Sequence, residues 1–321
     1  MEPLDIYVLN VGQADTAIIK TPGGNLILID AYKGPKVRRV LDALAPNPAI
    51  SHLIVTHPHR DHHLAVGQVL KNYRVDRVTL APFWYRAKTE PLLGDDLYMK
   101  YINFAHEQRI ALRFLGGYQR SYPDGRKYPD YSNEVCLELL GPPHDILEEL
   151  QESEVINYNH LSIIARLSYG EHFSMVFAGD AQMENWAHYD RENMLEKCTI
   201  LKAAHHGSMN GTQWERLERL GPKLVIVSAK RKKGELPDLI GSTTFWKYER
   251  NHKGRLVVLT ATTGTIKISV TDPETGRYET VCYGESAKSS DIPWDEAQDA
   301  LPPTNWPQIV QEKWEEAQHE V

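Results

Sequence analysis

Short apolar runs separated by turn residues and helical stretches predict a layered α/β protein. Residues 4–20 alternate short apolar stretches, and residues 25–30 form an apolar run that ends in an acid. We therefore expect strands there, joined by a hairpin near Pro22-Gly23-Gly24. Residues 37–44 have the apolar spacing of a helix, and the apolar run 52–55 follows after a Pro-containing loop. Strand, helix and strand in this order are typical of an α/β layer.

A similar succession of elements returns in the second half of the chain. We expect strands over residues 161–167 and 173–177, and a helix over residues 183–195. Three later apolar runs predict further strands over residues 224–228, 255–260 and 265–270, the last of the series. The chain therefore reads as two similar halves.

Composition and charge favour a globular protein and leave many substrates open. The chain has 321 residues, of which 41% are hydrophobic and 25% are charged, and its net charge is −7. Apolar runs are too short to cross a bilayer, and the N-terminus lacks the features of a secretory signal, so we expect a cytoplasmic protein. Residues 286–321 hold eight acids and two lysines, so the rest of the chain is nearly neutral. That balance argues against a generally basic DNA-coating protein but does not exclude a nucleic-acid substrate.

We expect one catalytic domain followed by a tail. The domain spans residues 1–285, and residues 83–155, rich in Tyr, Arg and turn residues, are either an insertion that shapes a substrate pocket or a surface elaboration. Residues 286–321 form an acidic, flexible tail. Its three tryptophans, Trp294, Trp306 and Trp314, are candidates for docking on a protein partner.

The segment Thr56-His57-Pro58-His59-Arg60-Asp61-His62-His63 is the strongest chemical signal. It follows the apolar run 52–55 directly, so a strand end would hold its side chains in place. A tight loop lets His57 and His59 meet one cation while Asp61 and His62 turn towards a second. Imidazole and carboxylate are ligands that Zn²⁺ and similar divalent metals accept. This spacing predicts a metal pair.

A metal pair needs further ligands, and two places offer them. Asp180 follows Gly179 at the end of a predicted strand, and its carboxylate could bridge two ions. His205 and His206 lie in the segment Leu201-Lys202-Ala203-Ala204-His205-His206-Gly207-Ser208. Adjacency alone does not decide which of the two rings points inward.

Together these segments resemble the metallo-β-lactamase-fold hydrolases, specifically the hydrolase domain of the ComEC competence proteins in a stand-alone form. The matching segments are NVGQAD (10–15), LILID (26–30), THPHRDHH (56–63), FAGDA (177–181) and LKAAHHGS (201–208). The resemblance runs from residue 4 to residue 270, covers 83–155 poorly, and does not reach the tail. It implies an α/β fold, a four-layer αββα sandwich of two packed mixed sheets flanked by helices. It also implies two divalent metal ions, Zn²⁺ or Mn²⁺.

The resemblance further implies roles for individual residues. Metal ligands would be His57, His59, Asp61 and His62, with Asp180 as the bridge and His205 completing the set, His206 being the close alternative. Asp30 would fix the imidazole of a ligand, and Asp15 would support a ligand or the local structure.

Two departures from the family's pattern matter. Many metallo-β-lactamase enzymes have another ligand histidine before the bridging Asp, and His160 is the candidate here, although ComEC-like sequences usually lack it. Relatives also often carry a histidine after a late strand, where this chain reads Lys230-Arg231-Lys232-Lys233. Those cations would either contact a phosphate-bearing substrate near the metals or form a solvated charge run. Ser208 could add a hydrogen bond to a phosphate or cap the helix that begins near Thr212.

The chemistry expected is metal-assisted hydrolysis. Asp61 is suited to orient or deprotonate the attacking water, and His205 or His206 to donate a proton to the leaving group. Our first hypothesis is a phosphodiesterase, specifically a nuclease acting on DNA. The alternatives are a hydrolase of a small ester, namely a phosphocholine ester, cyclic nucleotide, lactone or β-lactam, and a metal-binding regulatory subunit that acts through a partner.

Overall fold

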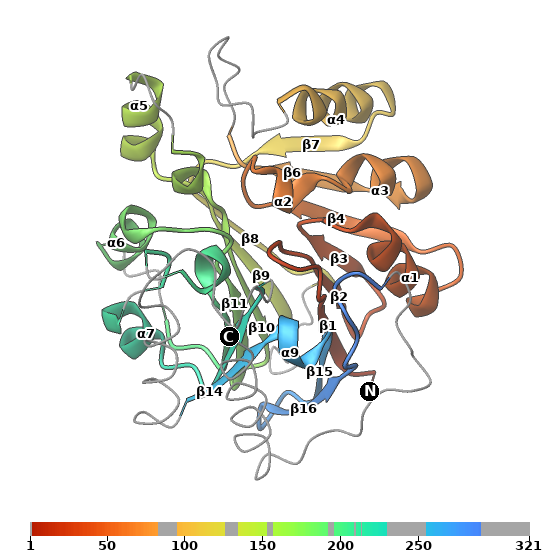
Figure 1. The fold of residues 1–321 in the computed structure, drawn as a ribbon, viewed down its shortest axis with the longest axis vertical. Helices are drawn as coiled ribbons and strands as arrows, with labels where there is room; N and C mark the ends of the chain where they lie inside the picture. The colour runs from red at the N-terminus through yellow and green to blue at the C-terminus, as the bar shows by residue number, and fades with distance from the viewer. Residues whose placement is uncertain are drawn as a thin grey trace.

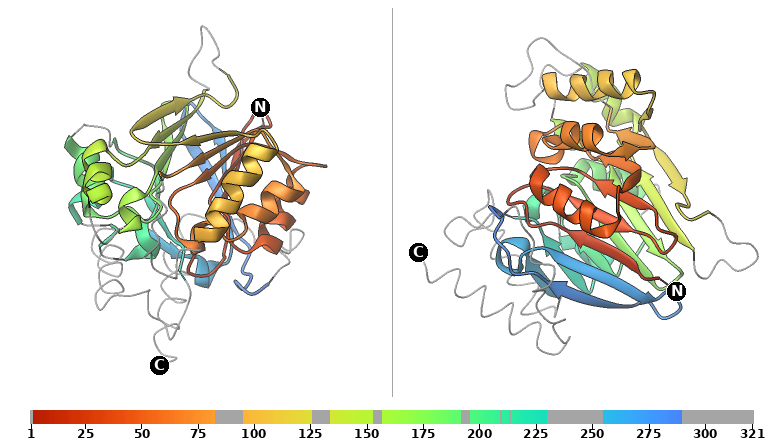
Figure 2. Two further views of the ribbon diagram at one scale, coloured as in Figure 1. Left: turned by 90° about the horizontal axis from the view of Figure 1, so that it is seen from above. Right: turned by 90° about the vertical axis from the view of Figure 1, so that its right-hand side faces the viewer.

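The computed structural model describes residues 2–82, 95–125, 134–152, 157–191, 196–208, 210–212, 214–229 and 255–289. Within these residues two β-sheets face each other, and helices cover the outer face of each sheet (Figures 1 and 2). The four layers that the sequence predicts are therefore present. No helix in the described ranges combines the length and apolar character that crossing a membrane requires.

The first sheet contains nine of the described strands. Its order is β16-β15-β1-β2-β3-β4-β6-β7, with β5 beside β4. The strands are β1 (Leu4–Val8), β2 (Ala17–Lys20), β3 (Leu26–Ile29), β4 (Ala49–Val55), β5 (Arg74–Val75), β6 (Arg77–Leu80), β7 (Ala111–Phe114), β15 (Ile266–Asp272) and β16 (Arg277–Cys282). Pairing is antiparallel from β16 to β3 and parallel from β3 to β7. The sheet is thus mixed, and the expected hairpin joins β2 to β3.

The second sheet contains seven of the described strands. Its order is β14-β13-β12-β11-β10-β9-β8. The strands are β8 (Tyr118–Ser121), β9 (Val135–Leu140), β10 (Ile164–Tyr169), β11 (Phe173–Phe177), β12 (Ile200–Lys202), β13 (Leu224–Val227) and β14 (Leu256–Leu259). Neighbours from β8 to β11 are antiparallel, and those from β11 to β14 are parallel. Since β7, β8 and β9 fall within residues 83–155, that segment supplies strands to both sheets.

Three apolar clusters hold the layers together. One lies between the sheets and joins Ile6 and Ile27 of the first sheet to Leu167 of the second. Another packs the first sheet against α1 (Gly34–Leu44), α3 (Val66–Asn72) and α4 (Asp95–Glu107). The third packs the second sheet against α6 (Met183–Arg191) and α7 (Trp214–Leu220). Ile146 and Leu150 of α5 (His144–Glu152) join the cluster between the sheets. Burial of apolar faces on both sides of each sheet stabilises this arrangement.

The last described residues of the chain contact the N-terminal half of the protein. Strand β16 was not expected from the sequence, because its side chains alternate between exposed and half-buried positions rather than forming an apolar run. After it, Glu285 forms a buried ion pair with Lys36 of α1, with 3.1 Å between Nζ and Oε1. Residues 290–321, including the three tail tryptophans, lie outside the described residues.

The parallel strands of the two sheets end next to each other. In the first sheet β3 and β4 are parallel neighbours, and in the second β11 and β12 are. The backbone NH of Ile163, which precedes β10, donates to the carbonyl of Thr56, which follows β4, at 2.9 Å. The carboxyl ends of parallel strands are the usual place for a functional site, and the candidate ligands lie there.

Candidate metal centre

Asp30 and Thr56 build the floor of the site at the ends of β3 and β4. Asp30 adopts a positive φ of 56°, which turns its carboxylate towards the neighbouring strand end. Its Oδ1 accepts from the backbone NH of Thr56 and its Oδ2 from the hydroxyl of the same residue, each at 2.8 Å. The carboxylate is almost completely buried, and two donors hold it in one orientation.

The Asp30 carboxylate sets the orientation of one candidate ligand. Nδ1 of His62 lies 2.7 Å from Oδ2 of Asp30. Because Nδ1–H donates to the carboxylate, Nε2 is the nitrogen that is placed to bind a metal. That nitrogen lies 3.2 Å from Oδ1 of Asp180. His62 belongs to the short helix α2 (Arg60–His63), which begins directly after His59.

Two groups of possible metal ligands meet at Asp180. The first, which we call the His57 position, consists of His57, His59 and Asp180. The second, the His206 position, consists of Asp61, His62, Asp180 and His206. Within each group, ligand atoms lie within 4.8 Å of one another. Since a tetrahedral zinc ion binds its ligands at about 2.0–2.2 Å, two ligand atoms of one ion are about 3.4 Å apart. The spacing and the chemistry of these donors therefore fit a divalent metal.

Asp180 is held where it can reach both positions. Its Oδ2 lies 3.7 Å from Nε2 of His57 and 3.6 Å from Nε2 of His206, while Oδ1 faces His62. Its backbone NH donates to the hydroxyl of Ser162 at 3.2 Å. Gly179, with φ of 52°, brings this strand end against Thr56, so that a Cβ at residue 179 would lie 3.1 Å from Cβ of Thr56.

Of the two adjacent histidines, His206 and not His205 belongs to the group with Asp61 and His62. Its Nε2 lies 3.1 Å from Oδ2 of Asp61, and its Nδ1 donates to the carbonyl of Ser228 at 3.1 Å. Both histidines have left-handed backbones, with φ of 46° at His205 and 52° at His206. Two successive non-glycine residues in this region are strained, which is common at functional sites. The left-handed turn presents both rings to the same site.

His205 lies on the more open side of Asp180. Its Nε2 is 3.9 Å from Oδ2 of Asp180, and its side chain is 19% exposed. Its Nδ1 lies 2.8 Å from Oδ1 of Asn210, which also accepts from the hydroxyl of Ser208. Asn210 therefore fixes the ring of His205 with Nε2 towards the site. Ser208 is buried, and its hydroxyl serves this turn.

His160 does not join either position. Its Nε2 lies 3.0 Å from Nδ2 of Asn157 and 3.2 Å from Oε2 of Glu184, in contacts near the start of α6. The upstream histidine that the sequence offered as a ligand is thus engaged elsewhere. Lys230, Arg231, Lys232 and Lys233, the candidate phosphate contacts, lie outside the described residues.

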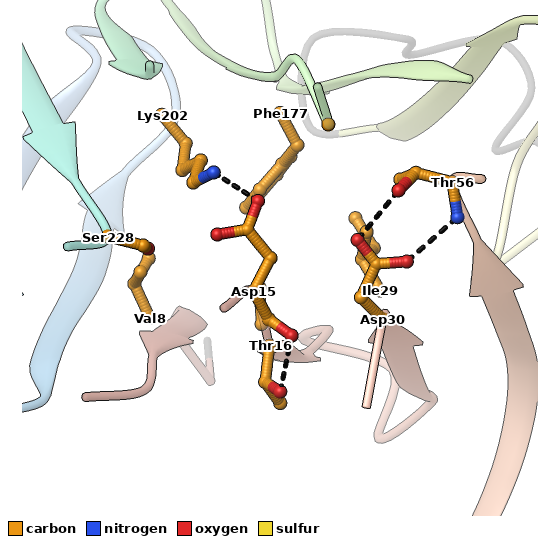
Figure 3. Close-up of a pocket in the computed structure, with 11 residues that line it drawn as sticks. Val8, Asp15, Thr16, Ile29, Asp30, Thr56, Phe177, Lys202 and Ser228 are labelled. Atoms are coloured by element: carbon orange, nitrogen blue, oxygen red, sulfur yellow. Dashed lines mark hydrogen bonds and ion pairs between the residues drawn. The ribbon is translucent and has the colours of Figure 1, made fainter. Parts of the chain in front are cut away.

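Asp15 pairs with a residue that the sequence analysis did not single out. Figure 3 shows its carboxylate facing the ammonium group of Lys202, from the end of β12. Oδ1 of the same carboxylate lies 3.6 Å from Nδ1 of His206. The lysine was visible in the sequence beside the two histidines, but nothing there indicated that it points between the sheets to a residue near the N-terminus.

Charges in the site favour a cation. Burial lowers the pKa of His57 well below the usual value, so this imidazole is neutral and free to ligate. Burial also opposes charge on His62, but attraction by Asp180, Asp30 and Asp61 outweighs it and raises the pKa of His62. Although burial would raise the pKa of Asp61, His62 and His206 lower it to about 2. The carboxylates thus create a field that holds positive charge at the His206 position.

Sequence comparisons give no family for the chain, whereas comparisons of structures give a fold. No family model and no curated protein matches the sequence. A variant of CmlA β-hydroxylase has a TM-score of 0.53 and 16% identity over 84% of this chain and 54% of its own. This chain therefore spans about half the length of that protein.

Two other similar structures cover nearly the whole of their own chains. Igni18, a metallo hydrolase from the archaeon Ignicoccus hospitalis, has a TM-score of 0.47 and 13% identity over 82% of this chain and 98% of its own. An isothiocyanate hydrolase from Delia radicum gut bacteria has a TM-score of 0.45 and 12% identity over 81% of this chain and 98% of its own. The sheet order and the helical layers show the four-layer αββα sandwich of two mixed sheets that the sequence led us to expect, and the CmlA variant is similar in fold over most of this chain.

Proposed function

We propose that this protein is a metal-dependent hydrolase that holds two divalent cations, Zn²⁺ or Mn²⁺, and cleaves phosphodiesters. The observation that carries the proposal is the position of Asp180, whose two oxygens face histidines of both groups. When bound there, two divalent cations supply Lewis acidity and an activated water at neutral pH. The chain's own residues would then bind, orient and protonate the reacting groups.

Asp61 is the candidate for orienting the attacking water. Its side chain is 35% exposed, so one carboxylate oxygen can reach the mouth of the site while Oδ2 faces His206. A carboxyl group with a pKa of about 2 is ionised at neutral pH and accepts a hydrogen bond from water. Asp61 therefore orients the water for attack.

His205 has two roles that fit its place. It lies near the His57 position, where a third imidazole would complete the ligands, and its partial exposure also suits proton donation to a leaving group. The metal content of a His205→Ala variant distinguishes these two roles, because a ligand is needed to retain the metal and a proton donor is not. In either role, Asn210 keeps the Nε2 of His205 turned inward.

A phosphodiester substrate is favoured by the ComEC-like motifs and by a cation in the metal-binding loop. Arg60 lies between His59 and Asp61 in the sequence and is exposed at the start of α2. An exposed arginine that neighbours the candidate ligands in the sequence suits an anionic substrate, because arginine binds phosphate oxygens in a fork. DNA is the phosphodiester that we place first.

The experiment is hydrolysis of fluorescently labelled single-stranded and double-stranded DNA with Mn²⁺ or Zn²⁺. His59→Ala and Asp180→Ala are the matched controls, because each removes a candidate ligand and both exclude a contaminating nuclease. Metal-dependent cleavage that both variants lose supports the nuclease. Binding of metal without cleavage of DNA, together with hydrolysis of a small ester, would overturn the nuclease and leave the metallohydrolase.

A further inference from the structure

A buried lysine lies beneath the candidate metal centre, where a charge needs a specific reason. Lys202 is the last residue of β12, and the alternation of the strand points Ile200 between the sheets and Leu201 towards the helices. Lys202 therefore points between the sheets, and it is only 3% exposed. Burying an ammonium group is costly unless an opposite charge compensates for it.

The compensating charge comes from the other sheet. Asp15 lies in the connection between β1 and β2, and its carboxylate forms an ion pair with Lys202 (Figure 3). The backbone NH of Asp15 also donates to the carbonyl of Asp61 at 3.4 Å. The pair thus connects β12 with the loop that carries a candidate metal ligand.

The pair lies directly behind a second candidate ligand. Oδ1 of Asp15 is 3.6 Å from Nδ1 of His206, on the side of the ring away from Asp61 and Asp180. The carbonyl of Ser228 accepts the Nδ1–H, and the adjacent carboxylate favours the same proton position. Both hold the lone pair on Nε2, the nitrogen that faces the His206 position.

The space around the pair excludes a direct role with substrate. The pocket bounded by Asp15, Asp30, Lys202 and Ser228 has a volume of about 10 Å³, which is the size of one water molecule. Both side chains of the pair are also buried, so they face each other and His206 rather than solvent. Lys202 and Asp15 therefore act through the histidine that they support.

The same kind of support is found behind the other histidine of this position. Nδ1 of His62 faces Asp30 at 2.7 Å, so both imidazoles of the His206 position have a carboxylate behind them. Nδ1 of His57 instead faces the hydroxyl of Thr56 at 3.2 Å. Carboxylates behind ligand imidazoles orient the rings and raise their basicity, whereas a neutral hydroxyl does so less.

We propose that Lys202 and Asp15 are positioning residues for His206, and that they make the His206 position the tighter of two unequal metal positions. This inference rests on the proposed two-metal function and adds an order of affinity. Lys202 compensates the charge of the Asp15 carboxylate in the protein interior and fixes this carboxylate against His206.

The test is stepwise competition for Zn²⁺ between the purified chain and a chromophoric chelator, which measures each metal equivalent without activity. His206→Ala and His59→Ala identify which equivalent belongs to which position. We expect Asp15→Asn to weaken the tighter equivalent by about 10–100-fold and to leave the weaker one within about twofold. The double variant Lys202→Met with Asp15→Asn leaves no unpaired buried charge, so it tests the same effect where a single variant folds poorly.

Lys36→Met is the matched control. It breaks another buried lysine–carboxylate pair, whose partners are Glu285 and the carbonyl oxygen of Asn10. We expect this variant to lose thermal stability and to keep both zinc affinities. Equal weakening of both equivalents by Asp15→Asn, or weakening of neither, would overturn the inference. A wild-type chain that binds no Zn²⁺ would overturn the proposed function itself, and the inference with it.

Discussion

Nδ1 of His62 lies 2.7 Å from Oδ2 of Asp30, and this contact turns the other ring nitrogen towards Asp180. The carboxylate is itself fixed by two hydrogen bonds from Thr56. An acid outside the two ligand groups that meet at Asp180 thus determines which nitrogen of His62 faces Asp180.

Replacing Asp30 by Asn should weaken metal binding while the fold is retained. The amide keeps the size of the side chain but loses its charge and one acceptor, so we expect an affinity loss of about 10–100-fold for the His206 position. Chelator competition measures it. Asp76→Asn is the control, because Asp76 forms an exposed pair with Arg74 on the surface. Affinity unchanged by Asp30→Asn would show that the carboxylate does not support the ligand.

Gly179 should tolerate a methyl group poorly, because two costs coincide there. Its φ of 52° is left-handed, which costs a non-glycine residue about 1–2 kcal/mol. An added Cβ would also lie 3.1 Å from Cβ of Thr56. We expect Gly179→Ala to lose stability on denaturant unfolding and to bind metal more weakly, since Asp180 must shift.

Gly24 separates the two costs. It also has a positive φ, of 86°, but no atom lies within 4 Å of an added Cβ. Gly24→Ala should therefore show the backbone cost alone and keep its metal affinity. Equal effects of the two alanines on stability and metal binding would mean that the contact with Thr56 is unimportant.

His52 should make the protein less stable in mild acid. Its ring is buried beside Thr79, and burial, with repulsion from Arg77, lowers its pKa to about 3. The unfolded chain binds that proton with a pKa of about 6.5. Between these values the unfolded state holds more protons, so the free energy of unfolding falls as the pH falls, by up to about 1.4 kcal/mol per pH unit.

The comparison with His52→Gln isolates this contribution, because the other histidines titrate in both proteins. We expect a smaller decrease in the unfolding free energy of His52→Gln between pH 6 and pH 4, measured by denaturant titration of the metal-free proteins. Parallel pH profiles for the two proteins would exclude the assignment to His52.

The metal content of the His205→Ala and His206→Ala variants tests whether each ring binds a metal ion. His206→Ala removes a donor 3.1 Å from Asp61, so we expect the loss of one metal equivalent. His205→Ala should also lose metal if its ring completes the His57 position, and should keep both equivalents if it only protonates the leaving group. Metal analysis of the dialysed proteins gives the count. Full retention by His206→Ala would contradict its place as a ligand.

The sequence predicted the layers and most of the strands that carry the candidate ligands, because those strands are buried runs that end in Asp or His. Strand β16 was not predicted, since its side chains, most of them exposed or half-buried, do not form an apolar run. The edge strands β7 and β8 were not predicted for the same reason, because their side chains are exposed or half-buried. An edge strand needs less apolar surface than a central one, so its pattern is weak.

The candidate site shows the same division between local and distant information. The loop from His57 to His62 is one continuous motif, and its spacing alone indicated a metal pair. Which of His205 and His206 faces Asp61 depends on two left-handed backbone positions, which residue type does not reveal. The pairing of Lys202 with Asp15 joins two sheets across 187 residues, so local spacing could not predict it.

The central claim is that the carboxylate of Asp180 is shared by two metal ions, and the most direct test counts metal in wild-type protein and in Asp180→Ala. Elemental analysis after dialysis against Zn²⁺-containing buffer should give about two equivalents for the wild type, as the two ligand groups imply. Asp180→Ala should retain less than one equivalent while its circular dichroism spectrum is unchanged. Two equivalents retained by Asp180→Ala would contradict the account.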